Sequence, residues 1–201
     1  MWLPDITLQA IGFRVVTLMV LAGVQGGVVS ATSVLLGDKG PKYDGRLTLV
    51  PISHIDPVGA IGLIFYGNGW AKPVAVDAEQ FRVGPVGLVV VILAGFAGVI
   101  VTAAALNALV LPALTILPHT AALAAAAFLR TASDLAIWFA LFSLVPIPPL
   151  TGGLLVGVLA PQMPRMERIL ALLLLVAVAT GVVRLVLGPA HSMVASFILG
   201  A

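Results

Sequence analysis

Between Arg82 and Arg130 the chain contains no Asp, Glu, Lys or Arg. A membrane-spanning helix needs about 20 mostly apolar residues, so this interval is long enough for two spans and a short connection. Over the whole chain, 61% of residues are hydrophobic and 9% are charged, whereas ordinary soluble domains are about 45–50% apolar and about 25% charged. The sequence therefore predicts an integral membrane protein.

The apolar runs predict an all-α polytopic membrane protein with about four to six membrane segments. The four long runs are Ile6–Leu36, Gly84–Leu111, Thr120–Val145 and Ile169–Leu187. Two shorter apolar stretches, Val58–Gly67 and Gly152–Ala160, are expected to enter the membrane and return on the same side. The alternation in Arg46–Ile52 and the polar stretch Val74–Val83 predict a small β element at the membrane boundary.

Charge and cysteine content limit the partners and the chemistry. The net charge of +2, with no Lys/Arg run, does not favour nucleic acid. The absence of cysteine excludes a disulfide framework, an iron–sulfur site and thiol catalysis. If the two short stretches return, the basic residues of three connections share one side, which the positive-inside rule makes cytoplasmic. These residues are Lys39, Lys42 and Arg46; Lys72 and Arg82; and Arg165 and Arg168.

The order of several short motifs resembles the site-2 protease family of intramembrane zinc metalloproteases. The matching stretches are "LLGD" (Leu35–Asp38), "HIDPVG" (His54–Gly59), "GWAKPVAVD" (Gly69–Asp77) and "PIPPLTGG" (Pro146–Gly153). The resemblance implies one membrane domain over residues 1–201, with a site-2 protease-like core at about 6–161 and an extra C-terminal span at about 169–187. It also implies a bacterial inner membrane location.

The same resemblance places the family's catalytic residues on positions that have lost their chemistry. The family's first span carries two zinc-binding histidines four residues apart, with the catalytic glutamate after the first, and an aspartate ligand follows the proline run. Here the histidine positions fall on Gln25 and Val29, the glutamate position on Gly26 and the aspartate position on Thr151. Valine cannot bind zinc, glycine cannot act as a base, and an amide and a hydroxyl are poor zinc ligands. We therefore expect no catalytic residue, no bound metal and no cofactor.

The hypothesis that follows is a catalytically inactive homologue acting as a structural or assembly subunit of a larger membrane complex. Its expected partners are other integral membrane subunits and the lipid bilayer. Two alternatives remain open: an active intramembrane zinc metalloprotease, and a small transporter or proton-conducting subunit built on Arg130 and Asp134. These two residues are four apart in an apolar run, so they are expected to pair within the membrane.

Small residues follow one face of the first predicted span. Gly23, Gly26 and Gly27 allow close approach, so they form a candidate helix-packing face. We expect protein to fill the space beside Gln25, with Thr151 hydrogen-bonded to Gln25 or to backbone.

The three histidines are expected to have structural or solvated roles. His54 and Asp56 belong to "HIDP", which is interpreted as a structural turn. His119 and His191 are interpreted as hydrogen-bonded or solvated histidines of a connection and a tail.

Overall fold

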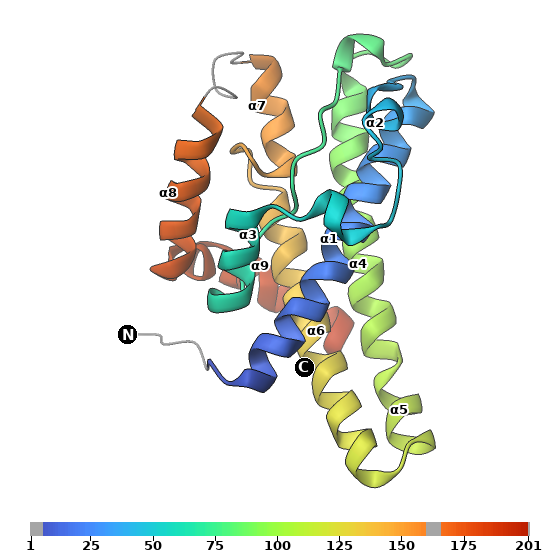
Figure 1. Cartoon of the computed structure of the whole chain (residues 1–201), viewed down its shortest axis with the longest axis vertical. Coiled ribbons are helices and arrows are strands. Elements are labelled where there is room, and N and C mark those ends of the chain that lie inside the picture. The colour runs from blue at the N-terminus through green and yellow to red at the C-terminus, as the bar shows by residue number, and fades with distance from the viewer. Residues whose placement is uncertain (1–5, 160–165, 201) are drawn as a thin grey trace.

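The computed structural model describes residues 6–159 and 166–200 and shows a bundle of helices (Figure 1). The predicted positions of Arg165 and of the end of the core near residue 161 lie outside the described residues. The described α-helices are α1 (Leu8–Leu36), α2 (Gly40–Tyr43), α3 (Pro57–Tyr66), α4 (Val86–Ala108), α5 (Val110–Ile116), α6 (His119–Ser143), α7 (Leu154–Leu159), α8 (Glu167–Ala179) and α9 (Val182–Leu199). Three short 3₁₀ helices are η1 (Pro51–His54), η2 (Ala78–Gln80) and η3 (Thr151–Gly153).

Four helical segments are long and apolar enough to cross a membrane: α1, α4 continued by α5, α6, and α9. The helices α1, α4 and α6 run along the long axis and pack on one another (Figure 1). Their shared core contains Leu21, Val99 and Ile137, all fully buried. The chain is therefore an all-α polytopic membrane protein, as the apolar runs predicted.

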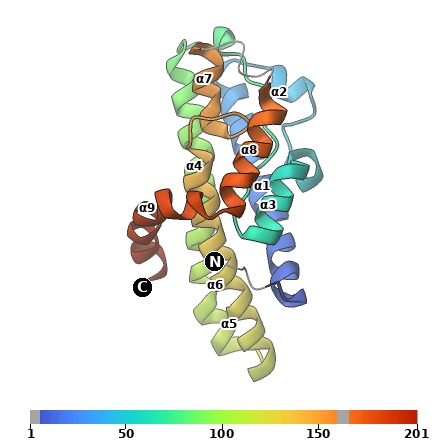
Figure 2. The ribbon, with the colours of Figure 1, turned by 90° about the vertical axis from the view of Figure 1, so that its left-hand side faces the viewer.

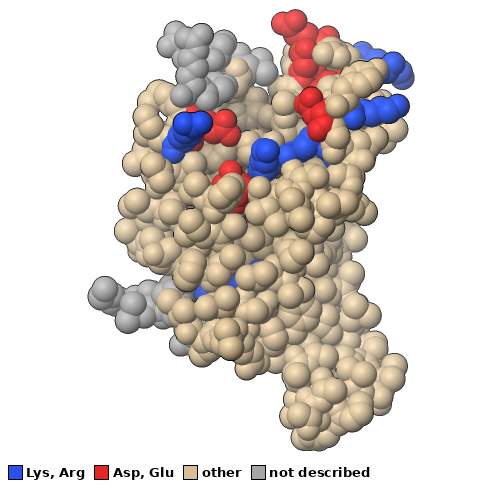
Figure 3. All heavy atoms as spheres, viewed as in Figure 1, with Lys and Arg blue, Asp and Glu red and all other residues tan. Residues whose placement is uncertain are grey.

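Charged side chains gather at one end of the molecule. Figure 3 shows Lys, Arg, Asp and Glu around the end where α2 and α7 lie in Figure 1. The opposite end, formed by α5 and the start of α6, is covered by uncharged residues in this view. Charged groups of both signs therefore share this end of the molecule, and the side of the membrane that it faces stays a prediction.

The predicted end of the second long apolar run, Gly84–Leu111, is wrong. The chain turns at Leu109 and continues as α5 to Ile116. Pro112 lies in the first turn of α5. A proline is tolerated there because the first amides of a helix have no intrahelical acceptor.

The last predicted span is also not one helix. Instead of a continuous segment over Ile169–Leu187, α8 ends at Ala179 and α9 starts at Val182. Gly181 separates them with φ +80, a left-handed conformation that favours glycine. The chain consequently changes direction, and α9 leaves the side of the bundle (Figure 2).

The predicted β element is wrong as well. The described residues contain no strand, and the nearest approach to one is a single antiparallel bridge between Ile55 and Ala71. Proline explains part of this result. Pro51 begins η1, and Pro73 has no amide hydrogen to donate to a sheet.

A buried arginine takes the place of a β ladder. The guanidinium of Arg46 donates hydrogen bonds to the carbonyl oxygens of Ser53, Lys72 (2.8 Å) and Pro73 (3.2 Å). These carbonyls belong to two stretches of irregular backbone that run side by side. One cationic side chain therefore satisfies acceptors that strands would otherwise have paired.

We predict that Arg46→Ala lowers the free energy of unfolding by about 2–4 kcal/mol, because three carbonyls lose a charged donor. Chemical unfolding in mild detergent measures this change. Lys42→Ala is the matched control, since Lys42 is exposed and four residues away. An Arg46→Ala protein as stable as Lys42→Ala would contradict the role assigned to the guanidinium.

Candidate functional site

Gly26 of α1 lies directly against the imidazole ring of His54. A Cβ atom on Gly26 would lie 2.0 Å from His54 Nδ1, so only glycine leaves room for the ring. His54 is 0% exposed, and its Nε2 atom lies 2.8 Å from the carbonyl oxygen of Thr48. Because a carbonyl only accepts, Nε2 carries the hydrogen and donates, while Nδ1 has no hydrogen-bond partner among the described residues.

Burial lowers the pKa of the His54 imidazole below its ordinary value. The hydrogen bond to Thr48 opposes this shift, and the nearby Arg46 charge adds to it. The imidazole is therefore uncharged at pH 7, and its role is to fill space beside α1. It occupies the position that a side chain at residue 26 would need.

Gly23 and Gly27 are covered by the same loop. A Cβ on Gly23 would lie 2.6 Å from the carbonyl oxygen of Leu49, and one on Gly27 would lie 2.6 Å from Leu49 Cδ2 and 3.0 Å from Thr48 O. The face formed by Gly23, Gly26 and Gly27 does allow close approach. However, it packs on the chain's own loop and η1, so its assignment to helix packing is wrong.

Helix α4 supplies the glycines that bring it close to α1. A Cβ on Gly95 would lie 2.7 Å from Val29 Cγ2, and one on Gly98 would lie 3.0 Å from Val28 Cγ2. Val29 is 2% exposed. The side chains of α1 thus pack against glycines of α4.

Gln25 and Thr151 line a cavity of only about 10 Å³. One water molecule needs about 10–15 Å³ of this kind of space, so protein fills the region almost completely, as expected. The expected hydrogen bond of Thr151, to Gln25 or to backbone, is wrong: the described residues show neither, and Gln25 Nε2 has no partner among them. Gln25 is nonetheless 2% exposed, so its amide is a buried donor next to this cavity.

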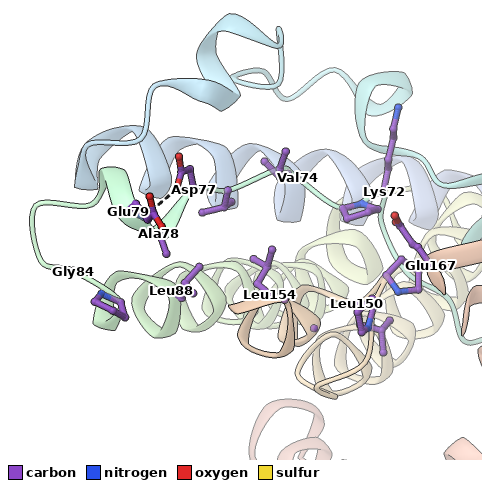
Figure 4. A pocket seen from close by; sticks show the side chains of 18 residues that line it. Lys72, Val74, Asp77, Ala78, Glu79, Gly84, Leu88, Leu150, Leu154 and Glu167 are labelled. Carbon is purple, nitrogen blue, oxygen red and sulfur yellow. Dashed lines mark hydrogen bonds between the residues drawn. The ribbon is translucent and has the colours of Figure 1, made fainter. Parts of the chain in front are cut away.

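A much larger groove of about 1100 Å³ lies next to the small cavity. The two share five lining residues: Lys72, Pro73, Val74, Leu150 and Leu154. Figure 4 shows the extended segment with Val74 and Asp77 on one side of the groove, and Leu88 and Leu154 on the helical side. Lys72, Asp77, Glu79 and Glu167 add charged groups to a largely apolar lining.

The extended side of the groove carries unpaired backbone. Val74, Ala75 and Val76 make no backbone hydrogen bond to any described residue. The next amide, that of Asp77, donates to Asp38 Oδ2 at 2.9 Å and fixes the end of the segment. Free amides and carbonyls beside an apolar groove can pair with a second extended chain.

The predicted pairing of Arg130 with Asp134 is wrong. Asp134 Oδ1 lies 3.0 Å from Nε2 of His191 in α9, and Arg130 is exposed. Helix α9 packs on α6 and brings a basic group from far along the chain to the carboxylate. His191 therefore contacts a carboxylate of another helix and is not a solvated tail histidine.

Comparison with known proteins identifies the family. The chain is 31% identical over 162 residues to the protein of Bacillus subtilis (strain 168) named "Putative zinc metalloprotease YwhC", and the match covers 77% of this chain and 72% of that protein. This chain belongs to the site-2 protease-like family of zinc metalloproteases. No family model and no solved structure matches it.

The zinc implied by the site-2 protease-like family does not fit the residues present here. Gln25 offers an uncharged amide and Thr151 a hydroxyl, while Gly26 and Val29 offer no side-chain donor. Among the described residues, no group of three or more His, Cys, Asp or Glu could hold a metal ion. The imidazole nearest to the site, that of His54, has one nitrogen on Thr48 O and the other against Gly26.

The sequence interpretation underestimated two residues that matter in this structure. Arg46 was interpreted only as a basic loop residue and His54 as part of a turn. A sequence signal did exist, because a lone arginine in an alternating apolar stretch and a histidine just before Asp-Pro both suggest fixed structural contacts. The turn itself is confirmed, since Asp56 Oδ1 accepts from the amide of Gly59 at 2.7 Å and caps α3.

We predict that Gly26→Ala lowers the free energy of unfolding by about 1–3 kcal/mol, because the new methyl overlaps the His54 ring. Gly12→Ala on the same helix is the control, since nothing lies within 4 Å of its Cβ position. Removing the ring with His54→Ala should make the added methyl at residue 26 much less harmful, which a double-mutant cycle measures. Equal effects of Gly26→Ala in both backgrounds would show that His54 does not fill this space.

Proposed function

We propose that this chain is a catalytically inactive member of its family that acts as a structural or assembly subunit of a larger membrane complex. The observation that carries the proposal is the His54 ring packed on Gly26. In the family resemblance, residue 26 is the position of the catalytic carboxylate. A carboxylate there would overlap the imidazole, so both the base and the space for it are missing.

The metal positions support the same conclusion. Catalytic zinc needs three good protein ligands and an open position for water. The side chains at the corresponding positions are an amide, a valine and a hydroxyl around a cavity of about 10 Å³. Neither the donors nor the volume suit metal-assisted hydrolysis.

The groove is where we place the partner contact. It combines about 1100 Å³ of volume with backbone at Val74, Ala75 and Val76 that makes no hydrogen bond within the described part of the chain. An extended segment of a membrane protein partner could pair with this backbone and bury apolar side chains against Leu88 and Leu154. We further propose that the charged end of the molecule faces the cytoplasm of a bacterial cell, because basic connections stay inside.

Zinc analysis tests the first part. We predict that the purified wild-type protein contains no stoichiometric zinc. The positive control for zinc detection is the triple variant Gln25→His/Val29→His/Thr151→Asp. It places good zinc ligands at the three positions and leaves Gly26 unchanged. Stoichiometric zinc in the wild-type protein, lost on Gln25→Ala, would overturn the assignment as an inactive homologue.

Crosslinking tests the second part. A photo-crosslinker at Ala75, which is exposed on the extended side of the groove, should capture a discrete membrane protein in cells. The same group at Leu123, exposed near the other end of the molecule, gives the background. Ala75→Pro removes one free amide hydrogen and should reduce co-purification of the captured protein in mild detergent. Capture at Leu123 and not at Ala75 would place the partner elsewhere.

A further inference from the structure

Arg130 places a permanent positive charge near the middle of α6. It is the twelfth of the 25 residues of this helix, so about 17 Å of helix lies on one side of it and about 20 Å on the other. Its side chain is exposed, and the described residues offer it no hydrogen bond and no ion pair. A candidate membrane span therefore carries a charge whose counter-ion is not found in the described part of this chain.

The carboxylate of the same helix is already engaged. Asp134 Oδ1 lies 3.0 Å from His191 Nε2, and Arg184 of α9 also interacts electrostatically with Asp134. The four candidate spans contain three arginines, Arg14, Arg130 and Arg184, whereas Asp134 is their one carboxylate. A second copy of this chain would bring the same excess of positive charge, so it would not neutralise Arg130.

The end of the molecule beyond Arg130 is suited to lipid and not to water. The chain carries no charged residue between Arg82 and Arg130, and this end is covered by uncharged residues in Figure 3. Its exposed large apolar residues include Leu111, Leu114, Ile116, Leu117 and Leu123. Such a surface on a membrane-spanning chain is stable in lipid. The membrane consequently extends past Arg130, to a depth where charged side chains normally face protein.

Arg130 lies on an open face of α6. Leu123, Ala127, Arg130 and Asp134 are spaced by four, three and four residues, which places them on one side of the helix. Leu123 is 54% exposed, and Ala127 is exposed as well. The small side chain of Ala127, less than one turn from Arg130, lets a second helix approach closely. This face thus combines room for a helix with a positive charge that lacks an opposite one.

We propose that this face of α6 binds a transmembrane helix of another membrane protein, and that this helix carries Asp or Glu opposite Arg130. The proposal rests on the subunit role inferred above and adds the chemistry of the partner. A guanidinium and a carboxylate attract one another most strongly away from water. They can also form two parallel hydrogen bonds, which fix the depth and rotation of the partner helix. No residue of α6 lines the groove, so this is a second contact surface.

Photo-crosslinking in cells tests the partner. A crosslinker at Ala127 should capture a membrane protein, and mass spectrometry should place the crosslink in an apolar segment of about 20 residues that contains Asp or Glu. The same group at Val101, which is 67% exposed on α4, gives the background. Capture of a second copy of this chain, capture of a segment without a carboxylate, or no capture above background overturns the proposal. A protein captured at Ala75 and not at Ala127 removes this contact but leaves the subunit role intact.

Arg130→Gln tests the charge. Co-purification of the captured protein in mild detergent should fall at least about ten-fold, because the partner's carboxylate is left without its counter-ion. Arg130→Lys keeps the charge and should weaken co-purification less. Arg168→Gln, which changes an exposed arginine at the start of α8, should have no effect. Co-purification that is the same for Arg130→Gln and wild type overturns the proposal.

Unfolding of the isolated chain separates this role from a structural one. Since Arg130 makes no hydrogen bond or ion pair within the described residues, Arg130→Gln should unfold like the wild type in detergent. A lower free energy of unfolding would place the effect of Arg130 inside this chain and would also overturn the proposal.

An exchange of charges tests the pair itself. Arg130→Glu should abolish co-purification, and replacing the carboxylate in the partner's crosslinked segment by Arg should restore it. If each single change abolishes co-purification and the double change does not restore it, the two groups are not paired and the proposal is wrong.

Discussion

Buried irregular backbone needs partners for its polar groups within the protein, and the guanidinium of Arg46 meets this requirement here. Its bonds to the carbonyls of Ser53, Lys72 and Pro73 hold two nonhelical stretches together. The amide of Lys72 donates in turn to His54 O at 2.8 Å. Fixing these stretches places the His54 ring over Gly26 and aligns the free backbone of residues 74–76 beside the groove.

The long helices could be predicted because each one satisfies its own backbone within an apolar run. Their ends were harder to predict, since the same residue type has different effects in different places. Gly181 breaks a helix, whereas Gly188 lies inside α9 without breaking it, although the proline that follows Gly188 favours a break there instead. The alternation in Arg46–Ile52 suggested a strand, but the stretch forms none, and its apolar residues Leu47, Leu49 and Ile52 are exposed whereas Arg46 is buried.

The positions that the family resemblance assigns to catalysis could be located by their order along the chain, and the residues at these positions, Gln25, Gly26, Val29 and Thr151, can be read from the sequence itself. What fills the space was not predictable. His54 reaches Gly26 through a loop whose path depends on Arg46. In the same way, Arg130 and Asp134 have the right spacing to pair, but spacing along one helix carries no information about α9. The contact with His191 is tertiary, and it replaces the local pair.

Helices α4 and α5, with Leu109 between them, span 31 residues, which at about 1.5 Å per residue is about 46 Å of nearly continuous helix. The hydrocarbon layer of a typical bilayer is only about 30 Å thick. The excess has to be absorbed by tilt or by local thickening of the lipid. The hairpin formed with α6 is therefore longer than the hydrocarbon layer, and the free energy of this protein in a membrane will depend on the thickness of the bilayer even when nothing binds to it.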